Sequence, residues 1–491
     1  MRKWWPLVTV CLGTFMLLID VTIVNVALPE MATDLGTSFS SLQWVVDGYA
    51  LSLGVLLLGA GALSDLYGHR RFYVGGLIVF ALASLACGLA ADPALLVEAR
   101  IVQGAGAAAM FTTTFALLNS SYQGRDRGVA YGIWGGVSGA ASAVGPILGG
   151  LLTEGLSWRW IFLVNLPICV AAVIMCFRTL RHDGPAKRGR FDLAGTLAFT
   201  VAAGALTFAV IRANDVGWSS IKTWGLLVVS AVALAAFALI ELRTPYAMFD
   251  LRLLRNRSFA GILLAGLLVN FAAFAAFTYT SIWLQSVVGL SPLQAGLTGL
   301  PMSICSVLAS GIAGARLHGR SPRLVIGGGM LLIGLGSLLS GVLVHAGSSW
   351  PALIAGYAVV GLGVGLVMPS LASSAMGAVP HRRGGMAAGS LTTARQLGYA
   401  IGIAVLGTVF AARAADRLGS TEAAHAVAGG QAGRLAGQIP SSVIHSAAAA
   451  GLDAGFFISG AVGLLCALAV FVLVRPAPPA PAKKPELVEV G

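Results

Sequence analysis

Two charged residues lie inside otherwise apolar segments of this sequence. Asp20 stands in LLIDVTIVNVALP, Leu17–Pro29, and Arg100 stands in EARIVQGAGAAA, near the end of another apolar segment. At roughly 1.5 Å per helical residue, both would lie about 9 to 13 Å from the same end of their helices. A carboxylate and a guanidinium at comparable depths can form an ion pair. The approach and withdrawal of Arg100 would then let Asp20 release and take up a proton.

Asp20 also has a structural interpretation, as a static polar bridge between helices that involves Thr22 or Asn25. An acid at the centre of a bilayer helix costs at least roughly 2.5 to 3.5 kcal/mol, so a functional gain is expected in return. Two further acids, Asp47 in QWVVDGYAL and Glu98, lie nearer the outer mouth. Either could serve a second proton or a cationic substrate, while Asp47 could equally be a solvated residue of the rim.

The embedded basic residues leave two interpretations open as well. Arg100 could extend its charged end to the interface. However, the Gln103, Gly104 and Gly106 that follow mark a packed, polar helix face, where an arginine more often lines a cavity. Arg395, in TARQLGYAIG, is the other basic residue inside an apolar segment. It could pair with lipid phosphate near the inner face or with a polar group of the last six helices.

The composition predicts the elements that must position these residues. The chain has 491 residues, of which 57% are hydrophobic and 10% charged, whereas soluble domains are about 25% charged. Apolar runs of the roughly 20 residues needed to cross a bilayer recur along its length, which predicts an all-α membrane bundle rather than a β-barrel. We count fourteen spans. All six cysteines fall inside them, so neither a disulfide framework nor a metal site is expected.

The basic residues predict how the spans are oriented. Most of the 31 Lys and Arg residues lie in alternate connections, beginning with the N-terminus. This positive-inside pattern places both termini in the cytoplasm of a multi-pass protein of the cytoplasmic membrane. It also accounts for the net charge of +12 without nucleic acid as a partner.

Charged connections predict a division into six, two and six helices. An N-terminal bundle would span residues 1–178, cytoplasmic linkers and two inserted helices residues 179–257, and a C-terminal bundle residues 258–491. The last part includes an extracellular segment of about 412–452, whose structure is left open, and a cytoplasmic tail. GALSDLYGHRR and GIAGARLHGRSPR occupy corresponding places in the two bundles, and such internal symmetry is typical of transporters.

The first of these repeated connections has the residues of a conformational latch. Gly61 and Gly68 permit close helix approach and a sharp bend, and Arg70 and Arg71 favour the cytoplasmic face. Asp65 could pair with a base or with a helix N-terminus. A simple topology anchor would explain the basic residues but leaves Asp65 unexplained.

The fifth span, with the sequence GGVSGAASAVGPILGG, presents small residues at helical spacing. Gly145 and Gly149 permit close packing against another helix, and Pro146 favours a kink. Packing alone explains the small face, but less readily the combination of Gly145, Pro146, Gly149 and Gly150.

Together these segments resemble the major facilitator superfamily, and specifically its fourteen-span drug:proton antiporters, the EmrB/QacA-like group. The resemblance covers essentially the whole chain. It rests on the Asp20 segment, the Gly61–Arg71 loop, the fourth-span residues around Arg100, the fifth-span glycines and WRWIFLVNLP, Trp158–Pro167.

The resemblance implies two six-helix halves that rock around a central cavity, with the inserted helices outside that core. It further implies that Arg100 assists proton coupling, that Asp20 is a protonation or substrate-cation site, and that Pro146 and its glycines shape the exchange pathway. Asp47 departs from the family pattern, which more often has a small polar residue there.

The expected function is proton-driven export of amphipathic drugs, antibiotics or toxic metabolites, cationic or not. We expect a functional monomer in contact with membrane lipids that is not an enzyme and needs no cofactor beyond the proton motive force. A carrier of a lipid, nutrient or other endogenous metabolite is the alternative. A receptor or enzyme is more remote, because the connections are short.

Overall fold

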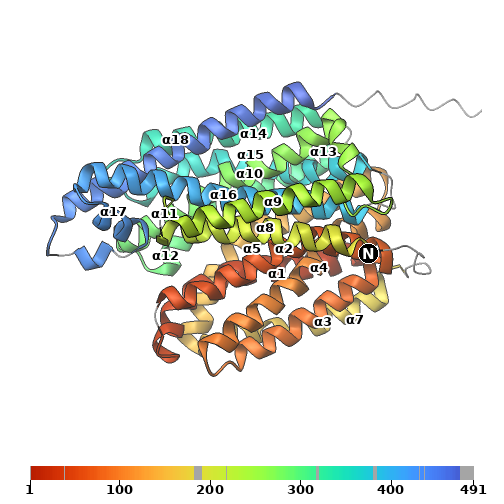
Figure 1. Ribbon diagram of the computed structural model, residues 1–491, viewed down its shortest axis with the longest axis horizontal. Coiled ribbons are helices and arrows are strands. Elements are labelled where there is room, and N and C mark those ends of the chain that lie inside the picture. The colour runs from red at the N-terminus through yellow and green to blue at the C-terminus, as the bar shows by residue number, and fades with distance from the viewer. Residues whose placement is uncertain are drawn as a thin grey trace, which may run out of the picture.

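The computed structural model of the chain describes residues 2–37, 39–181, 191–216, 218–316, 320–379, 384–430, 432–435 and 437–475. Within these ranges the regular structure is helical, and Figure 1 shows long helices lying side by side. Apolar side chains suit the interior of a bilayer, where helices satisfy the backbone hydrogen bonds within each segment. Thirteen helices of the described part are long and apolar enough to cross a membrane. The count of fourteen spans stays a prediction.

The described part of the N-terminal half contains seven α-helices, two of which share one span. They are α1 (Trp5–Asp34), α2 (Phe39–Tyr67), α3 (His69–Gly88), α4 (Pro93–Ser121), α5 (Gly124–Gly155), α6 (Trp160–Leu163) and α7 (Asn165–Thr179). Local sequence sets several of their ends. At the start of α4, for example, the Asp92 side chain accepts a hydrogen bond from the Leu95 N–H at 2.9 Å, and Pro93 occupies the first turn.

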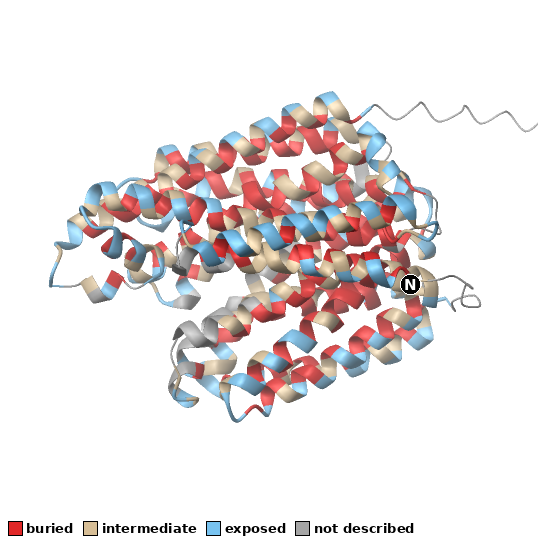
Figure 2. Cartoon of the chain, in the orientation of Figure 1, coloured by how far each residue is buried: buried red, intermediate tan, exposed pale blue. Residues whose placement is uncertain are grey.

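Two inserted helices, α8 (Leu193–Val216) and α9 (Ile221–Arg243), pack against each other. One side of this pair meets the core through α2 and α16, and Phe199 and Phe237 contribute to a shared apolar cluster there. Figure 2 shows many exposed residues along α9. The pair therefore lies against the two halves rather than within either of them.

The C-terminal half is built from more, and more often interrupted, helices in the described part of the chain. They are α10 (Arg257–Asn270), a π-helical turn η3 (Phe271–Ala275), α11 (Ala276–Ser286), α12 (Pro292–Leu297), α13 (Leu300–Arg316), α14 (Pro322–Leu343), α15 (Ile354–Gly377), α16 (Gly384–Leu418), α17 (Thr421–Ala428) and α18 (Ser441–Leu473). The described part of the 412–452 segment is largely helical, because α16 and α18 extend into it on either side of α17.

The two halves meet along α2 with α16 and along α5 with α13 and α15. Small residues allow these contacts. A Cβ atom on Gly389 would lie 2.9 Å from the Leu57 carbonyl oxygen, and one on Gly135 would lie 2.9 Å from the Pro369 side chain. Close approach of helix backbones thus replaces large side chains at this interface.

Candidate functional site

The N-terminal half encloses a polar cluster around Asp20. Its Oδ2 atom accepts a hydrogen bond from Arg100 Nη1 at 2.5 Å. Its Oδ1 atom accepts from Gln103 Nε2 and from Asn165 Nδ2, each at 3.0 Å. Ser84 completes the cluster by accepting from Gln103 Nε2 at 2.8 Å. Four helices, α1, α3, α4 and α7, therefore contribute to one network.

Arg100 has several contacts besides Asp20. Its Nε donates to the Val45 carbonyl at 2.9 Å, and Nη1 also donates to Gln103 Oε1 at 2.7 Å. The guanidinium carbon lies 4.1 Å from the centre of the Tyr49 ring, a cation–π distance. Arg100 and Asp20 are both 0% exposed. The pair is thus a desolvated, electrically neutral unit, and Arg100 does not extend to the interface.

Glycines allow close contact between helices in and beside this cluster. A Cβ atom on Gly104 would lie 2.6 Å from the Tyr49 carbonyl oxygen, so α4 can approach α2 this closely only without a side chain there. On the other side, a Cβ on Gly149 would lie 2.9 Å from the Ile23 carbonyl oxygen, and one on Gly145 would overlap Thr22 Oγ1. The small face of α5 thus packs on α1, which carries Asp20, whereas the buried Gly150 has no atom within 4 Å of an added Cβ.

Other sequence-predicted residues lie apart from the cluster. Thr22 donates to the Leu18 and Ile19 carbonyls of its own helix, so it does not bridge Asp20 to another helix. Glu98 is exposed on α4. The side chains of Asn25, Asp47 and Pro146 lie outside the described part of the structure.

Sequence reasoning did not assign Asn165, Ser84 or Tyr49 to the site. A polar Asn165 within the apolar WRWIFLVNLP segment is a signal that could have found the first of them. Ser84 and Tyr49 carry no such signal, because serine and tyrosine are ordinary residues of membrane helices.

The segment Gly61–Arg71, which contains the end of α2, Gly68 and the start of α3, connects the two halves. Asp65 Oδ2 accepts a hydrogen bond from the Met386 backbone N–H at 3.0 Å, in the first turn of α16. Asp65 Oδ1 lies 3.6 Å from His69 Nε2. A carboxylate at a helix N-terminus is favoured by the exposed N–H groups and the helix dipole. Of the two partners considered for Asp65, the structure therefore provides the helix N-terminus and a neighbouring histidine.

The other residues of this segment have distinct environments. Gly61 is buried, and Gly68 has φ +100°, a conformation that favours glycine, immediately before α3. Arg70 is buried, with Nη2 donating to the Phe177 carbonyl at 3.2 Å and its guanidinium over the Phe177 ring. Arg71 is exposed. The two adjacent arginines therefore have different roles.

A second ionic contact lies at the far end of α1. Asp34 Oδ2 accepts from Arg159 Nη1 at 2.6 Å and from Trp158 Nε1 at 2.9 Å. The hydrogen bond from Arg159, followed by that from Trp158, lowers the pKa of Asp34. This pair connects α1 to the start of α6.

Arg395 lies in the C-terminal half. Its Nε donates to Asn270 Oδ1 at 3.4 Å, which joins α16 to the end of α10. Of the two expectations for Arg395, this contact matches a polar group of the last six helices.

Comparisons with known proteins agree with this architecture. The family model described as Major Facilitator Superfamily matches residues 10–403. The multidrug resistance protein Stp of Mycobacterium tuberculosis is 38% identical over 407 residues, which cover 83% of this chain and 75% of that protein. The tetracenomycin C resistance and export protein of Streptomyces glaucescens is 31% identical over 505 residues, which cover 97% and 93% of the two chains.

A solved structure of the human organic anion transporter MFSD10 has the same fold, with a TM-score of 0.64 at 16% sequence identity. The match covers 95% of this chain and 99% of that one. Helical architecture, family match and sequence relatives lead to one assignment. The chain belongs to the Major Facilitator Superfamily.

Proposed function

We propose that the protein is a proton-driven antiporter that exports amphipathic drugs, antibiotics or toxic metabolites across the cytoplasmic membrane, with both termini in the cytoplasm. Relatives named for drug resistance and export support the export function. The observation that carries the proton coupling is the buried Asp20–Arg100 pair, since it encloses a carboxylate together with its counter-charge. The fourteen-span, EmrB/QacA-like assignment belongs to the same proposal.

Asp20 would be the proton acceptor. In the structure, its carboxylate accepts three hydrogen bonds from Arg100, Gln103 and Asn165. A proton on Asp20 removes the negative charge and leaves the Arg100 cation buried without a counter-ion, which is costly. Protonation therefore favours a rearrangement of α1 against α4, and return of Arg100 releases the proton.

The Asp65 latch would connect this rearrangement to alternating access. The Asp65–Met386 hydrogen bond holds α2 to the first turn of α16 at the predicted cytoplasmic end. Opening a path from the cytoplasm requires this bond to break, whereas opening the outer side does not. The structure thus fits a state in which the cytoplasmic side is held closed.

The energy of one proton is adequate for such a task. A proton that enters down about 150 mV releases about 3.5 kcal/mol, taken from roughly 2.3 kcal/mol per charge per 100 mV. At about 1.4 kcal/mol per factor of ten, this sustains a gradient of roughly 300-fold for an uncharged substrate.

Everted membrane vesicles with an acidic lumen test the proposal. Rhodamine 6G and fluorescein share one aromatic ring system but are respectively a cation and an anion, so uptake of either dye would demonstrate export. We expect Asp20→Asn to abolish gradient-driven uptake. Asp34→Asn is the matched control, because it makes the same change on the same helix outside the buried cluster, and it should transport normally.

Exchange of dye without a gradient separates coupling from structure. A coupling role predicts that Asp20→Asn retains this exchange while it loses gradient-driven uptake. Loss of both in a folded protein would assign Asp20 to substrate binding or to the structure. Equal gradient-driven uptake by parent and Asp20→Asn would contradict the coupling proposal, and a parent that moves neither dye would contradict drug export of this kind.

A further inference from the structure

Arg100 and Arg395 both lie well inside membrane spans but have very different surroundings. Arg100 has a carboxylate, a carbonyl, an amide oxygen and an aromatic ring around it. Arg395 has, among the described residues, one hydrogen bond to Asn270 Oδ1 at the long distance of 3.4 Å and no ion pair with an acid. A guanidinium offers several donors in a planar fork. Most of the donor capacity of Arg395 is therefore unused by the described residues.

Arg395 lies inside the helical bundle rather than against lipid. The helix that carries it, α16, packs against α2, α4, α8, α10, α15 and α18. Arg395 is nevertheless only half-buried. It stands nine residues beyond Met386, the first residue of the span Met386–Leu418, or about 13 Å along the helix from the Asp65 latch. Arg395 therefore lies well above the predicted cytoplasmic end of this span.

Contacts on either side show which face of α16 carries Arg395. Gly398 and Gly402 touch α10 and η3, where a Cβ atom would meet Leu267 and Phe271 respectively. Gln396 instead lies toward α2, where a Cβ atom on Gly54 would be 3.7 Å from it. Arg395 lies on the α10-facing side of the helix, since a Cβ atom on Gly266 would be 3.7 Å from its Cγ atom. Because the adjacent Gln396 faces α2 of the other half, Arg395 lies near the boundary between the two halves.

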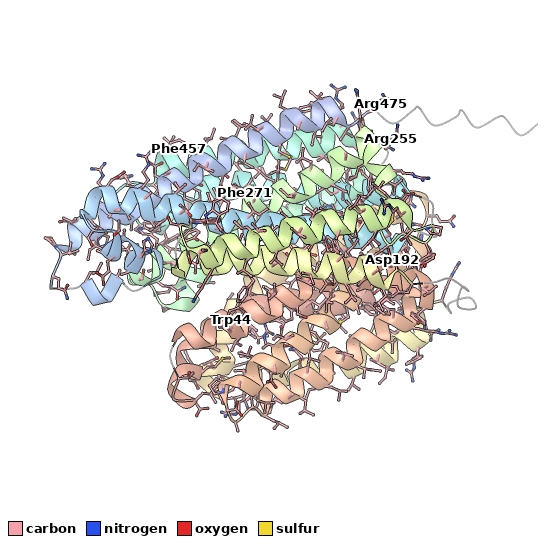
Figure 3. All side chains as sticks on the ribbon, in the orientation of Figure 1. Trp44, Asp192, Arg255, Phe271, Phe457 and Arg475 are labelled. Carbon is pink, nitrogen blue, oxygen red and sulfur yellow. The ribbon has the colours of Figure 1, made fainter. Side chains whose placement is uncertain are left out.

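The neighbouring helix is locally rearranged at the same level. Directly after Asn270, α10 changes to the π-helical turn η3, and such turns often occur at functional sites. Phe271 of this turn is labelled in Figure 3 among the helices of the C-terminal half. One turn beyond Arg395, the Tyr399 hydroxyl is 3.1 Å from Thr278 Oγ1 on α11. A cation, an amide, hydroxyl groups and aromatic rings are therefore close together.

From this arrangement we infer that Arg395, supported by Asn270, is the contact for an acidic group on the transported compound, so that amphipathic organic anions with a carboxylate or phenolate on an aromatic body are among the substrates. This inference specifies a substrate class for the proposed exporter and rests on that function. It differs from a site selective for cations, since an embedded positive charge would repel a cation. Bidentate pairing with a planar anionic group is the interaction for which a guanidinium is suited.

A lipid phosphate shares this chemistry but fits the position less well. A headgroup would have to reach Arg395 between α10 and α16, about 13 Å from the cytoplasmic end of the span. A soluble amphipathic compound would instead approach Arg395 from the boundary between the two halves, where α16 meets α2. The test therefore includes an anionic lipid as a competitor.

Dye binding to the purified full-length protein in an uncharged detergent tests the inference. We expect the parent to bind fluorescein and Arg395→Gln to bind it at least about tenfold more weakly, as loss of a charge-assisted hydrogen bond implies. Arg395→Lys should be intermediate because it keeps the charge but not the fork. Arg417→Gln is the matched control, since Arg417 is exposed in the last turn of the same helix, and it should change binding less than about twofold.

Rhodamine 6G binding and melting temperature identify a merely structural role. Arg395→Gln should bind the cation as well as the parent does, or more tightly, and should melt near the parent temperature. If Arg395→Gln does not fold, Arg395→Lys supplies the comparison, because weaker fluorescein binding with unchanged rhodamine binding is expected there too.

Two results would overturn the inference. One is a parent that binds fluorescein no better than the folded arginine variants do. The other is displacement of fluorescein from the parent by phosphatidylglycerol, which would assign the site to a lipid headgroup. Failure of both dyes to move in vesicles would contradict export but would leave these binding results in place, so the two proposals fail separately.

Discussion

The Asp20–Arg100 pair makes a quantitative prediction about stability. Both side chains are 0% exposed, so water and salt do not screen their interaction. Asp20→Asn leaves the Arg100 cation without its counter-ion and places an amide donor near the donors of Gln103 and Asn165. Breaking a buried pair by removing one partner costs about 3 to 5 kcal/mol. Arg100→Gln strands the carboxylate and should cost a similar amount.

The double variant Asp20→Asn/Arg100→Gln should be more stable than either single variant, because no charge remains buried alone. Two neutral amides can exchange hydrogen bonds with Gln103 and Asn165, so the coupling free energy should reach about 3 kcal/mol or more. For a folding unit of about 180 residues, a loss of 3 to 5 kcal/mol corresponds to a fall in melting temperature on the order of 10 °C. The double variant should recover most of it without recovering gradient-driven transport.

Thermal unfolding of the purified protein in detergent, followed by tryptophan fluorescence, measures this cycle. Single-variant effects that simply add in the double variant would refute the reasoning. The effects should also be insensitive to salt, whereas any effect of Asp34→Asn should fade as salt is added, since Asp34 is exposed.

Three further predictions concern the Asp65 latch, the packing of α5 on α1 and the Asp34–Arg159 ion pair. Asp65→Asn removes a charge at a helix N-terminus, an interaction of about 1 kcal/mol. It should shift the population toward a cytoplasm-open state about fivefold. Distances between spin labels on α2 and α16 would reveal this shift, and an unchanged distance distribution would contradict the prediction. Gly145→Ala should separate α5 from α1 and lower the melting temperature. Adding Thr22→Ala should restore part of the melting temperature, because it removes the hydroxyl that the new Cβ overlaps. If the second substitution restores nothing, the loss has a different cause. The folded-state pKa of Asp34 lies below its ordinary value of 3.8, so its contribution to stability should be complete above about pH 4 and vanish as the pH falls through the lowered pKa. Asp34→Asn or Arg159→Gln should therefore reduce the fall of the melting temperature at acid pH. An unchanged fall in either variant would show that the Asp34–Arg159 pair does not cause it.

Much of this protein could be predicted from its sequence. Because a bilayer interior accepts few charges and no unsatisfied backbone groups, apolar segments of sufficient length specify membrane helices without knowledge of their neighbours. Under the same constraint an embedded charge stands out, so Asp20, Arg100 and Arg395 could all be identified in this way. The comparable depths of Asp20 and Arg100 even indicated that they could meet.

Tertiary structure decided which groups surround those charges. Asn165 is separated from Asp20 by 145 positions, and their hydrogen bond depends on how α7 and α1 are rotated, which no local pattern specifies. The neighbours Arg70 and Arg71 carry the same charge, but only the helix packing buries one against Phe177 and exposes the other. The 412–452 segment likewise had no clear sequence signal, because its Ala- and Gly-rich composition leaves helical order to the packing of α16, α17 and α18.

Asp65 shows what the sequence determines and what the packing decides. The sequence by itself determined that Asp65 follows a membrane span in a basic, glycine-containing turn and that it would seek a base or a helix N-terminus. Only the packing of the two halves brought it to the N–H of Met386, 321 positions away. The physical reason is that charge and hydropathy act at each residue and can be read locally, whereas partners are set by close packing between helices distant in the chain.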